Sequence, residues 1–427
     1  MILLPLVLVI VTVVIARVSD KNKGIKEKKA LTNCCKLIYT YLLSPLASIP
    51  NAGILAPVSR LLWEFPTDFR GKLTLELPEL HKKLGPLVRI GPNQVSFYSL
   101  EIYKTVHAPN SPFVKDPRVY SQFVQDGHPA LFSITNPKEH AQRRRHMGIL
   151  FNRSKVPALT EMMVGRIDRL ANYLAIASQK GPIDLMPTCR ALESDIVSTF
   201  AFGNAIGAID SLDTGKELGV IKENDAKSSK MPVVAHILYA LSLNQTFQAE
   251  LVSDLEAAGW PIDMTALESI PRLKACVKEG IRWTGAAAAM LPRIVPKGGY
   301  VLAGRHLHDQ TMVSSSPIWY LRDEVAFPDP EKYKPALWLV KDIDGATALR
   351  DDYYIPFSKG ASTCIGNHFA YLELFLAVSQ LLRRYSIRPG EKSVGTAANH
   401  EAVLPPRREW VAAVPVGQLI VTFEGRE

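Results

Sequence analysis

The stretch Phe357–Gly366, FSKGASTCIG, places a single cysteine, Cys364, between two glycines and directly before a long apolar run. Residues Gly366–Tyr385 have the apolar spacing of a helix, so the cysteine is predicted to lie at a helix start. Backbone N–H groups at that end of a helix are unpaired, and together with the helix dipole they favour a thiolate over a thiol.

The residues around Cys364 suit a flat ligand. Gly360 and Gly366 let the backbone turn sharply and let a flat group approach closely, and we expect Phe357 to cover the sulfur and exclude water. A shielded thiolate with N–H donors suits the axial ligation of haem iron, where its electron push favours O–O cleavage. A buried, inert thiol is the alternative, and the cysteine considered without its neighbours favours that alternative.

Composition narrows the class of protein. The chain has 427 residues, of which 47% are apolar, so it can bury a large core. The net charge is +9, but 50 basic and 41 acidic residues are mixed without a dense basic block interleaved with aromatics, so nucleic-acid binding is not expected. Five scattered cysteines without a CxxC pair argue against a disulfide framework and a structural zinc site.

The N-terminus differs from the rest of the chain. Residues Ile2–Ala16 are uncharged and almost wholly apolar, and a basic stretch follows them. A helix of that length rises ~22 Å, short of a ~30 Å hydrocarbon core, so spanning requires bilayer thinning or snorkelling ends. A cleaved signal peptide is the alternative, but it usually carries charge before the apolar run. Positive charge behind the run favours a cytosolic domain.

We therefore expect a transmembrane anchor at residues 1–18, a basic and proline-rich linker at 19–57, and one helix-rich α+β domain at 58–427. Residues Gly85–Ser99 alternate around GPN and predict a hairpin. Helical spacing is present in several long stretches. These are Val156–Gln179, Arg190–Gly203, Val233–Gly259 and Ile270–Trp283. A β-type stretch, Pro292–Gly304, follows, and the chain ends in predicted hairpin strands.

Phe357–Gly366 resembles the haem-ligand loop of the cytochrome P450 superfamily, the haem-thiolate monooxygenases. Four further segments resemble family segments and stand in the family's order. They are HAQRRRHMGILF (140–151), the Glu279-x-x-Arg282 pair, LPRIVP (291–296) and FPDPEKYKPALWL (327–339). The resemblance covers most of residues 43–425. Within the superfamily, the sequence most resembles microsomal fungal enzymes of terpenoid and polyketide pathways.

The resemblance implies a mainly α (α+β) cytochrome P450 fold with small β-sheets and a set of site residues. Cys364 would ligate the iron, and Glu279 and Arg282 would form a structural ion pair near the proximal side. The residues that would contact the haem, two of them through its propionates, are Arg144, Arg293, Phe357, Gly360 and Gly366.

The resemblance also implies the activity. Such an enzyme holds haem b and takes electrons from NADPH through a cytochrome P450 reductase. It hydroxylates or epoxidises a lipophilic small molecule. The microsomal type is a single-pass protein of the endoplasmic reticulum membrane, with its catalytic domain facing the cytosol.

Two departures from the family pattern affect the residues expected to hold the haem and support its proximal side. The family usually has Arg or His two residues before the cysteine, bonded to a propionate, whereas this chain has Ser362; a charge-assisted bond worth ~1.5–3 kcal/mol is lost. The family's meander carries Pro-Glu-Arg, whose arginine joins the Glu-x-x-Arg pair, whereas this chain has Pro335, Ala336 and Leu337. Glu279 and Arg282 would then pair only with each other, or bind backbone carbonyls.

The third departure is that the middle of this chain is shorter than the resemblance implies. Only 31 residues separate Asn204 from His236, where the family places the helices that roof the substrate pocket. An ungapped match puts Ser229 at the position of the family's proton-relay threonine, yet neighbouring charges equally suit a solvated loop. The shortening around 204–230 leaves a gene-model error, a catalytically degenerate and non-enzymatic membrane protein, and an open-pocket enzyme as alternatives.

Overall fold

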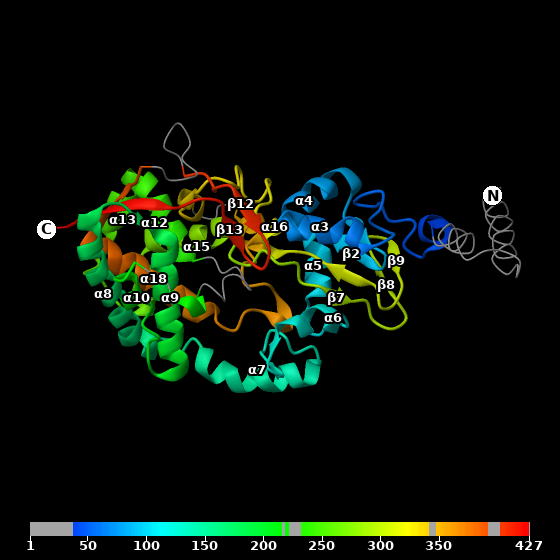
Figure 1. Ribbon diagram of the computed structural model, residues 1–427, viewed down its shortest axis with the longest axis horizontal. Helices are drawn as coiled ribbons and strands as arrows, with labels where there is room; N and C mark the ends of the chain where they lie inside the picture. The colour runs from blue at the N-terminus through cyan, green and yellow to red at the C-terminus, as the bar shows by residue number, and fades with distance from the viewer. Residues whose placement is uncertain (1–36, 216–217, 222–231, 341–346, 392–401, 427) are drawn as a thin grey trace, which may run out of the picture. The chain divides into compact units, whose positions relative to one another are not determined.

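The structure, a computed structural model, describes residues 37–215, 218–221, 232–340, 347–391 and 402–426 (Figure 1). These residues form two compact units. The first unit contains the described residues up to Asn136 together with Leu291–Ser315, and the second unit contains Pro137–Met290 and the described residues from Ser316 onwards.

The first unit is built on a five-stranded sheet in the order β1-β2-β10-β7-β3. β10 runs parallel to β2, and the other neighbouring pairs are antiparallel. Figure 1 shows the early, blue part of this unit beside its late, yellow strands. The strands are β1 (Leu87–Gly91), β2 (Gln94–Phe97), β3 (Val114–Lys115), β7 (Arg293–Ile294) and β10 (Met312–Ser314).

The hairpin predicted for Gly85–Ser99 is confirmed. β1 and β2 pair antiparallel, with Leu87 opposite Phe97, and the chain turns between Gly91 and Gln94. Both strands are buried along their length, so the hairpin lies in the core of the first unit. The other helices and short strand pairs of this unit are α3 (Glu64–Phe69), α4 (Leu73–Leu84), α5 (Leu100–Val106), α6 (Pro117–Tyr120), β4 (Val124–Gln125), β5 (His128–Pro129), β8 (Tyr300–Leu302) and β9 (Arg305–Leu307).

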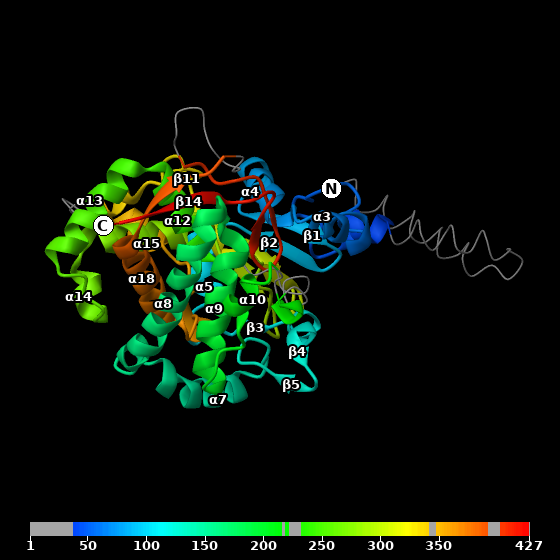
Figure 2. The ribbon, with the colours of Figure 1, turned by 60° about the vertical axis from the view of Figure 1, so that its left-hand side comes forward.

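The second unit is mainly helical. Its long helices are α7 (Pro137–Phe151), α8 (Thr160–Ala177), α9 (Leu185–Phe202), α12 (Val233–Leu243), α13 (Gln245–Ala257), α15 (Pro271–Thr284) and α18 (Asn367–Arg384). Shorter elements are α10 (Ala208–Leu212), α14 (Met264–Ser269), α16 (Pro317–Leu321), α17 (Ala348–Tyr353), β6 (Ile183–Asp184), β11 (Tyr385–Pro389), β12 (Arg407–Glu409), β13 (Ala413–Pro415) and β14 (Ile420–Gly425). α8, α9, α12 and α18 pack against one another (Figure 2).

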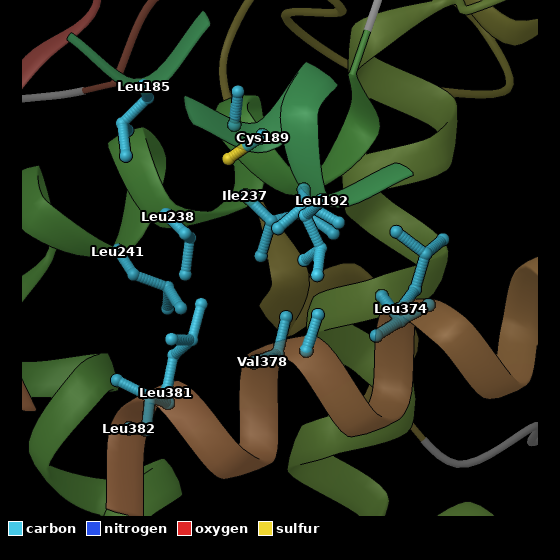
Figure 3. Close-up of a cluster of buried hydrophobic side chains, with 14 of the residues drawn as sticks. Leu185, Cys189, Leu192, Ile237, Leu238, Leu241, Leu374, Val378, Leu381 and Leu382 are labelled. Carbon is cyan, nitrogen blue, oxygen red and sulfur yellow. The ribbon is translucent and has the colours of Figure 1, made fainter. Parts of the chain in front are cut away.

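The core of the second unit lies between α9, α12 and α18. Figure 3 shows their aliphatic side chains meeting, with Cys189 among the leucines. α12 is buried on nearly all sides. α15 approaches α12 so closely that a Cβ on Gly280 would lie 2.2 Å from Cγ1 of Ile237. This contact fixes the helix that carries Glu279.

One helix prediction is wrong. Val233–Gly259, predicted as one helix, is two helices that meet at Asn244. The backbone of Asn244 is not helical, and its side-chain oxygen accepts a hydrogen bond from the N–H of Phe247, so it caps α13. A local cap therefore interrupts an otherwise continuous apolar pattern.

The predicted membrane anchor and Ser229 lie outside the described residues. Among the residues that the structure describes, no helix combines the length and apolar character needed to cross a bilayer.

Candidate active site

The loop Phe357–Gly366 closes on itself through backbone hydrogen bonds. The N–H of Cys364 donates to the carbonyl of Phe357 (2.9 Å), and the N–H of Thr363 donates to the carbonyl of Gly360 (3.1 Å). Gly360 has φ of +71°, a conformation that glycine adopts without strain. The loop thereby holds Cys364 three residues before the first residue of α18.

Cys364 carries the only accessible thiol among the described cysteines. Cys189 and Cys276 are buried; burial raises the pKa of Cys189 well above its ordinary range and that of Cys276 to about 12. Desolvation by the surrounding chain also raises the pKa of the Cys364 thiol, and the N–H of Gly366 and the charge of Arg144 oppose that rise. Among the described cysteines, a ligand can therefore reach only the thiol of Cys364.

Phe357 contacts both α18 and the backbone of Cys364. The ring of Phe357 packs against Tyr371, with centroids 5.6 Å apart, while the side chain of Cys364 remains exposed. Phe357 acts on the cysteine through its carbonyl, which accepts the Cys364 N–H. In the chain by itself, the sulfur is thus open toward a ligand.

Arg144 lies beside the cysteine loop. It extends from α7, and its Nη1 donates to the carbonyl of Thr363 at 2.6 Å. Its guanidinium forms no other hydrogen bond or ion pair with the described residues, so further donors remain for an anion near Cys364. This contact joins segments 219 residues apart in the sequence.

Gly366 leaves open space in front of the loop. A Cβ added there would have only Cε1 of Phe151 within reach, at 3.9 Å, and the backbone φ of −87° suits any residue. Neither the conformation nor the packing of the described chain requires glycine at this position. The open space fits the close approach of a flat cofactor.

Arg293 is a buried cation in the first unit. It is 9% exposed. Its backbone pairs with β3 and β10, but its side chain makes neither a hydrogen bond nor an ion pair with the described residues, and its Nε is buried without a partner. Desolvation lowers the pKa of Arg293, opposed by Tyr120 and Tyr103. A buried cation without a counterion is costly, so this arginine fits a site for an anion such as a haem propionate.

Glu279 and Arg282 form a fully buried ion pair, 0% and 1% exposed. Nε and Nη2 of Arg282 donate to the two carboxylate oxygens, both at 2.8 Å. Arg282 also donates to three backbone carbonyls, those of Leu321, Pro330 and Lys332. Both arrangements foreseen from the sequence, mutual pairing and binding to carbonyls, are present at once.

The sequence did not indicate the two remaining donors to Glu279. The N–H of Lys334 donates to Oε1 at 2.7 Å, and the indole Nε1 of Trp338 donates to Oε2 at 2.9 Å. Each carboxylate oxygen therefore accepts two hydrogen bonds. The sequence signal that could have indicated Trp338 is its position: it offers a donor directly after Leu337, which stands where the family has an arginine.

Ser362 stands at the other departure from the family pattern, two residues before the cysteine. It is half-buried in the cysteine loop.

Comparison with known proteins gives the family. Residues 228–411 match the family model described as Cytochrome P450. Among curated relatives, cytochrome P450 monooxygenase macH of Penicillium terrestre is 23% identical over 84% of this chain and 90% of that protein. Cytochrome P450 monooxygenase ankB of Aspergillus thermomutatus is 26% identical over 84% of this chain and 86% of that protein. The matched domain and these curated relatives together support a fungal cytochrome P450.

This cytochrome P450 is of the fungal type, and its fold combines helices with small sheets as the family's does. It is a monooxygenase, an oxidoreductase whose family uses haem-thiolate iron, a redox partner and a small-molecule substrate. In the second unit, the accessible sulfur of Cys364 and the unused donors of Arg144 fit that cofactor. In the first unit, the buried Arg293 fits an anionic group.

The comparisons also bear on the length of this cytochrome P450. The alignment with macH is 462 positions long, more than the 427 residues of the chain, although it uses only 84% of them. macH therefore has many residues without a counterpart here. The family match begins at residue 228, directly after most of the stretch that the sequence predicts to be shortened.

Proposed function

We propose that this cytochrome P450 hydroxylates or epoxidises a lipophilic small molecule, a terpenoid or polyketide intermediate of a secondary-metabolite pathway. One oxygen atom of dioxygen enters the substrate and the other leaves as water, with two electrons and two protons consumed. The observation that carries the proposal is the accessible Cys364 in a closed loop beside Arg144. The fungal monooxygenase relatives support the oxidation of a small molecule.

The site residues would divide the work of holding haem b. Cys364 would ligate the iron, and Arg144 and Arg293 would pair with the propionates, because both have donors that the described chain leaves unused. Gly360 and Gly366 would keep the loop tight and open to the porphyrin face. When bound, the haem would supply oxygen activation. The protein would hold and orient the haem and place charged groups around it.

We also propose the partners and location. Electrons would come from NADPH through a cytochrome P450 reductase. Residues 1–18 would anchor the protein in the endoplasmic reticulum membrane by a single pass, and the basic residues behind them would keep the catalytic domain in the cytosol. Glycosylation of the full-length protein would contradict this orientation.

The cofactor assignment is tested on the full-length protein expressed with ample haem. We expect a carbon-monoxide difference spectrum of the thiolate type, and we expect Cys364→Ala to lose it. The matched control is Cys276→Ala, which removes a buried thiol outside the loop and should leave the band in place. A thiolate-type spectrum that survives Cys364→Ala would rule out the proposed ligand.

Turnover is tested separately, because the stretch around 204–230 is shorter than the resemblance implies. We propose that Ser229 supplies the proton-relay hydroxyl. Reconstitution with reductase and NADPH should then give product, and Ser229→Ala should reduce product formation while leaving the haem spectrum unchanged. A full haem complement without any product would instead favour a catalytically degenerate member of the family.

A further inference from the structure

Glu279 has a complete set of hydrogen bonds although the arginine expected at its side is absent. Position 337 is leucine, yet the carboxylate of Glu279 accepts two hydrogen bonds at each oxygen. Three of the four donors come from Arg282 and the backbone. The fourth is the indole N–H of Trp338, the last residue of the 3-10 helix Pro335–Trp338.

We propose that Trp338 is a positioning residue that replaces the missing arginine and holds the cysteine loop in place through Glu279 and Tyr354. The proposal rests on the proposed haem-thiolate function. Trp338 touches no reacting atom; its role is to fix the chain segment that supports Cys364.

The ring of Trp338 is held from several sides. Nζ of Lys278 lies 4.0 Å from the ring centroid, and Cζ of Arg350 lies 4.7 Å from it. The side chain of Arg350 also donates to the carbonyl of Leu337, so it fixes the backbone next to the indole. Cation–π contacts of this kind orient the ring, and the orientation directs its N–H at the carboxylate of Glu279.

A series of contacts leads from Trp338 to the cysteine loop within the second unit. The ring of Tyr354 packs edge-on against Trp338 at 4.8 Å, and its hydroxyl lies 3.0 Å from the hydroxyl of Tyr371. Tyr371 packs against Phe357, whose carbonyl accepts the N–H of Cys364. A shift of the indole would therefore disturb the loop that presents the sulfur.

The test compares two indole deletions in the haem-loaded, full-length protein. Trp338→Phe removes the N–H that faces Glu279. The matched control, Trp283→Phe, removes an indole N–H that donates to the carbonyl of Glu331 at 2.7 Å. The readouts are the rate of haem transfer to apomyoglobin and the proportion of thiolate-type to thiol-type signal in the carbon-monoxide spectrum.

We expect Trp338→Phe to release haem faster, by about tenfold, the order expected from one lost hydrogen bond to a charged group, and to gain thiol-type signal. Trp283→Phe should lower the unfolding temperature and leave the spectrum unchanged. Equal spectra for the two single variants would overturn the proposal.

A second measurement separates this proposal from the proposed function. If the wild-type chain takes up no haem, the function is wrong. The link between Trp338 and Glu279 is then judged from urea unfolding of the haem-free chain with Trp338→Phe, Glu279→Gln and both changes together. Coupled effects support the positioning contact, and strictly additive effects reject it.

Discussion

Replacing Arg282 tests how strongly the buried ion pair supports the second unit. Arg282→Met removes the partner of a carboxylate with 0% exposure, which costs about 3–5 kcal/mol in buried pairs. It also removes the donors to three backbone carbonyls, each worth about 1–3 kcal/mol when left unsatisfied. These losses approach the whole stability of a typical domain, about 5–15 kcal/mol, so we expect this variant not to fold.

Arg282→Lys gives a measurable intermediate. It keeps the charge but has one nitrogen in place of the planar fork, so it cannot reproduce the bidentate pair. Lysine has three N–H donors for the five bonds that Arg282 makes, so at least two bonds are lost. We expect the free energy of unfolding to fall by about 2.5–6 kcal/mol, the size of one charge-assisted hydrogen bond and one unsatisfied carbonyl. The assay is urea unfolding of the purified chain, followed by tryptophan fluorescence.

The control is an exposed arginine–carboxylate pair. Nη2 of Arg384 lies 2.7 Å from Oδ1 of Asp168, with side chains 40% and 41% exposed. Arg384→Lys should change the free energy of unfolding by less than about 1 kcal/mol, because solvent screens such pairs. If Arg282→Lys proves as mild as Arg384→Lys, the reasoning from burial and satisfied carbonyls is refuted.

Three further predictions follow from single contacts. Gly280→Ala should lower the free energy of unfolding by about 1–3 kcal/mol, because its Cβ would lie 2.2 Å from Cγ1 of buried Ile237; unchanged urea unfolding would contradict this. Arg144→Met should raise the pKa of the Cys364 thiol, because it removes a nearby positive charge; alkylation of the haem-free protein should then shift to higher pH. Burial lowers the pKa of Lys278 to about 8 from its ordinary 10.5, so the unfolded chain binds more protons between these values, and wild-type stability should rise with pH there relative to Lys278→Met.

The sequence predicted the features that depend on local pattern. The hairpin around Gly91 to Gln94 and the helix after Cys364 follow from residue spacing and turn residues close in the chain. The break at Asn244 was missed for a local reason as well. Its side chain offers the backbone a cap that competes with helix continuation, and apolar spacing does not reveal that competition.

The sequence alone did not indicate contacts between distant segments. Arg144 was assigned to a cofactor by resemblance, but its bond to Thr363 spans 219 residues and depends on how α7 packs in the second unit. The same holds for Glu279, whose donors Lys334 and Trp338 arrive 55 and 59 residues later. Packing, which spacing does not encode, brings these groups together.

The absence of an arginine at position 337 has a physical explanation in charge as well as in hydrogen bonding. Glu279 and Arg282 cancel each other's charge in a site closed to water, and a second guanidinium would leave that site with an uncompensated positive charge. Lys278 and Arg350 already lie against the ring of Trp338. A neutral indole completes the carboxylate's hydrogen bonds without adding a cation beside them. What a buried carboxylate requires is a donor for each lone pair, and residue type matters only through the charge that comes with the donor.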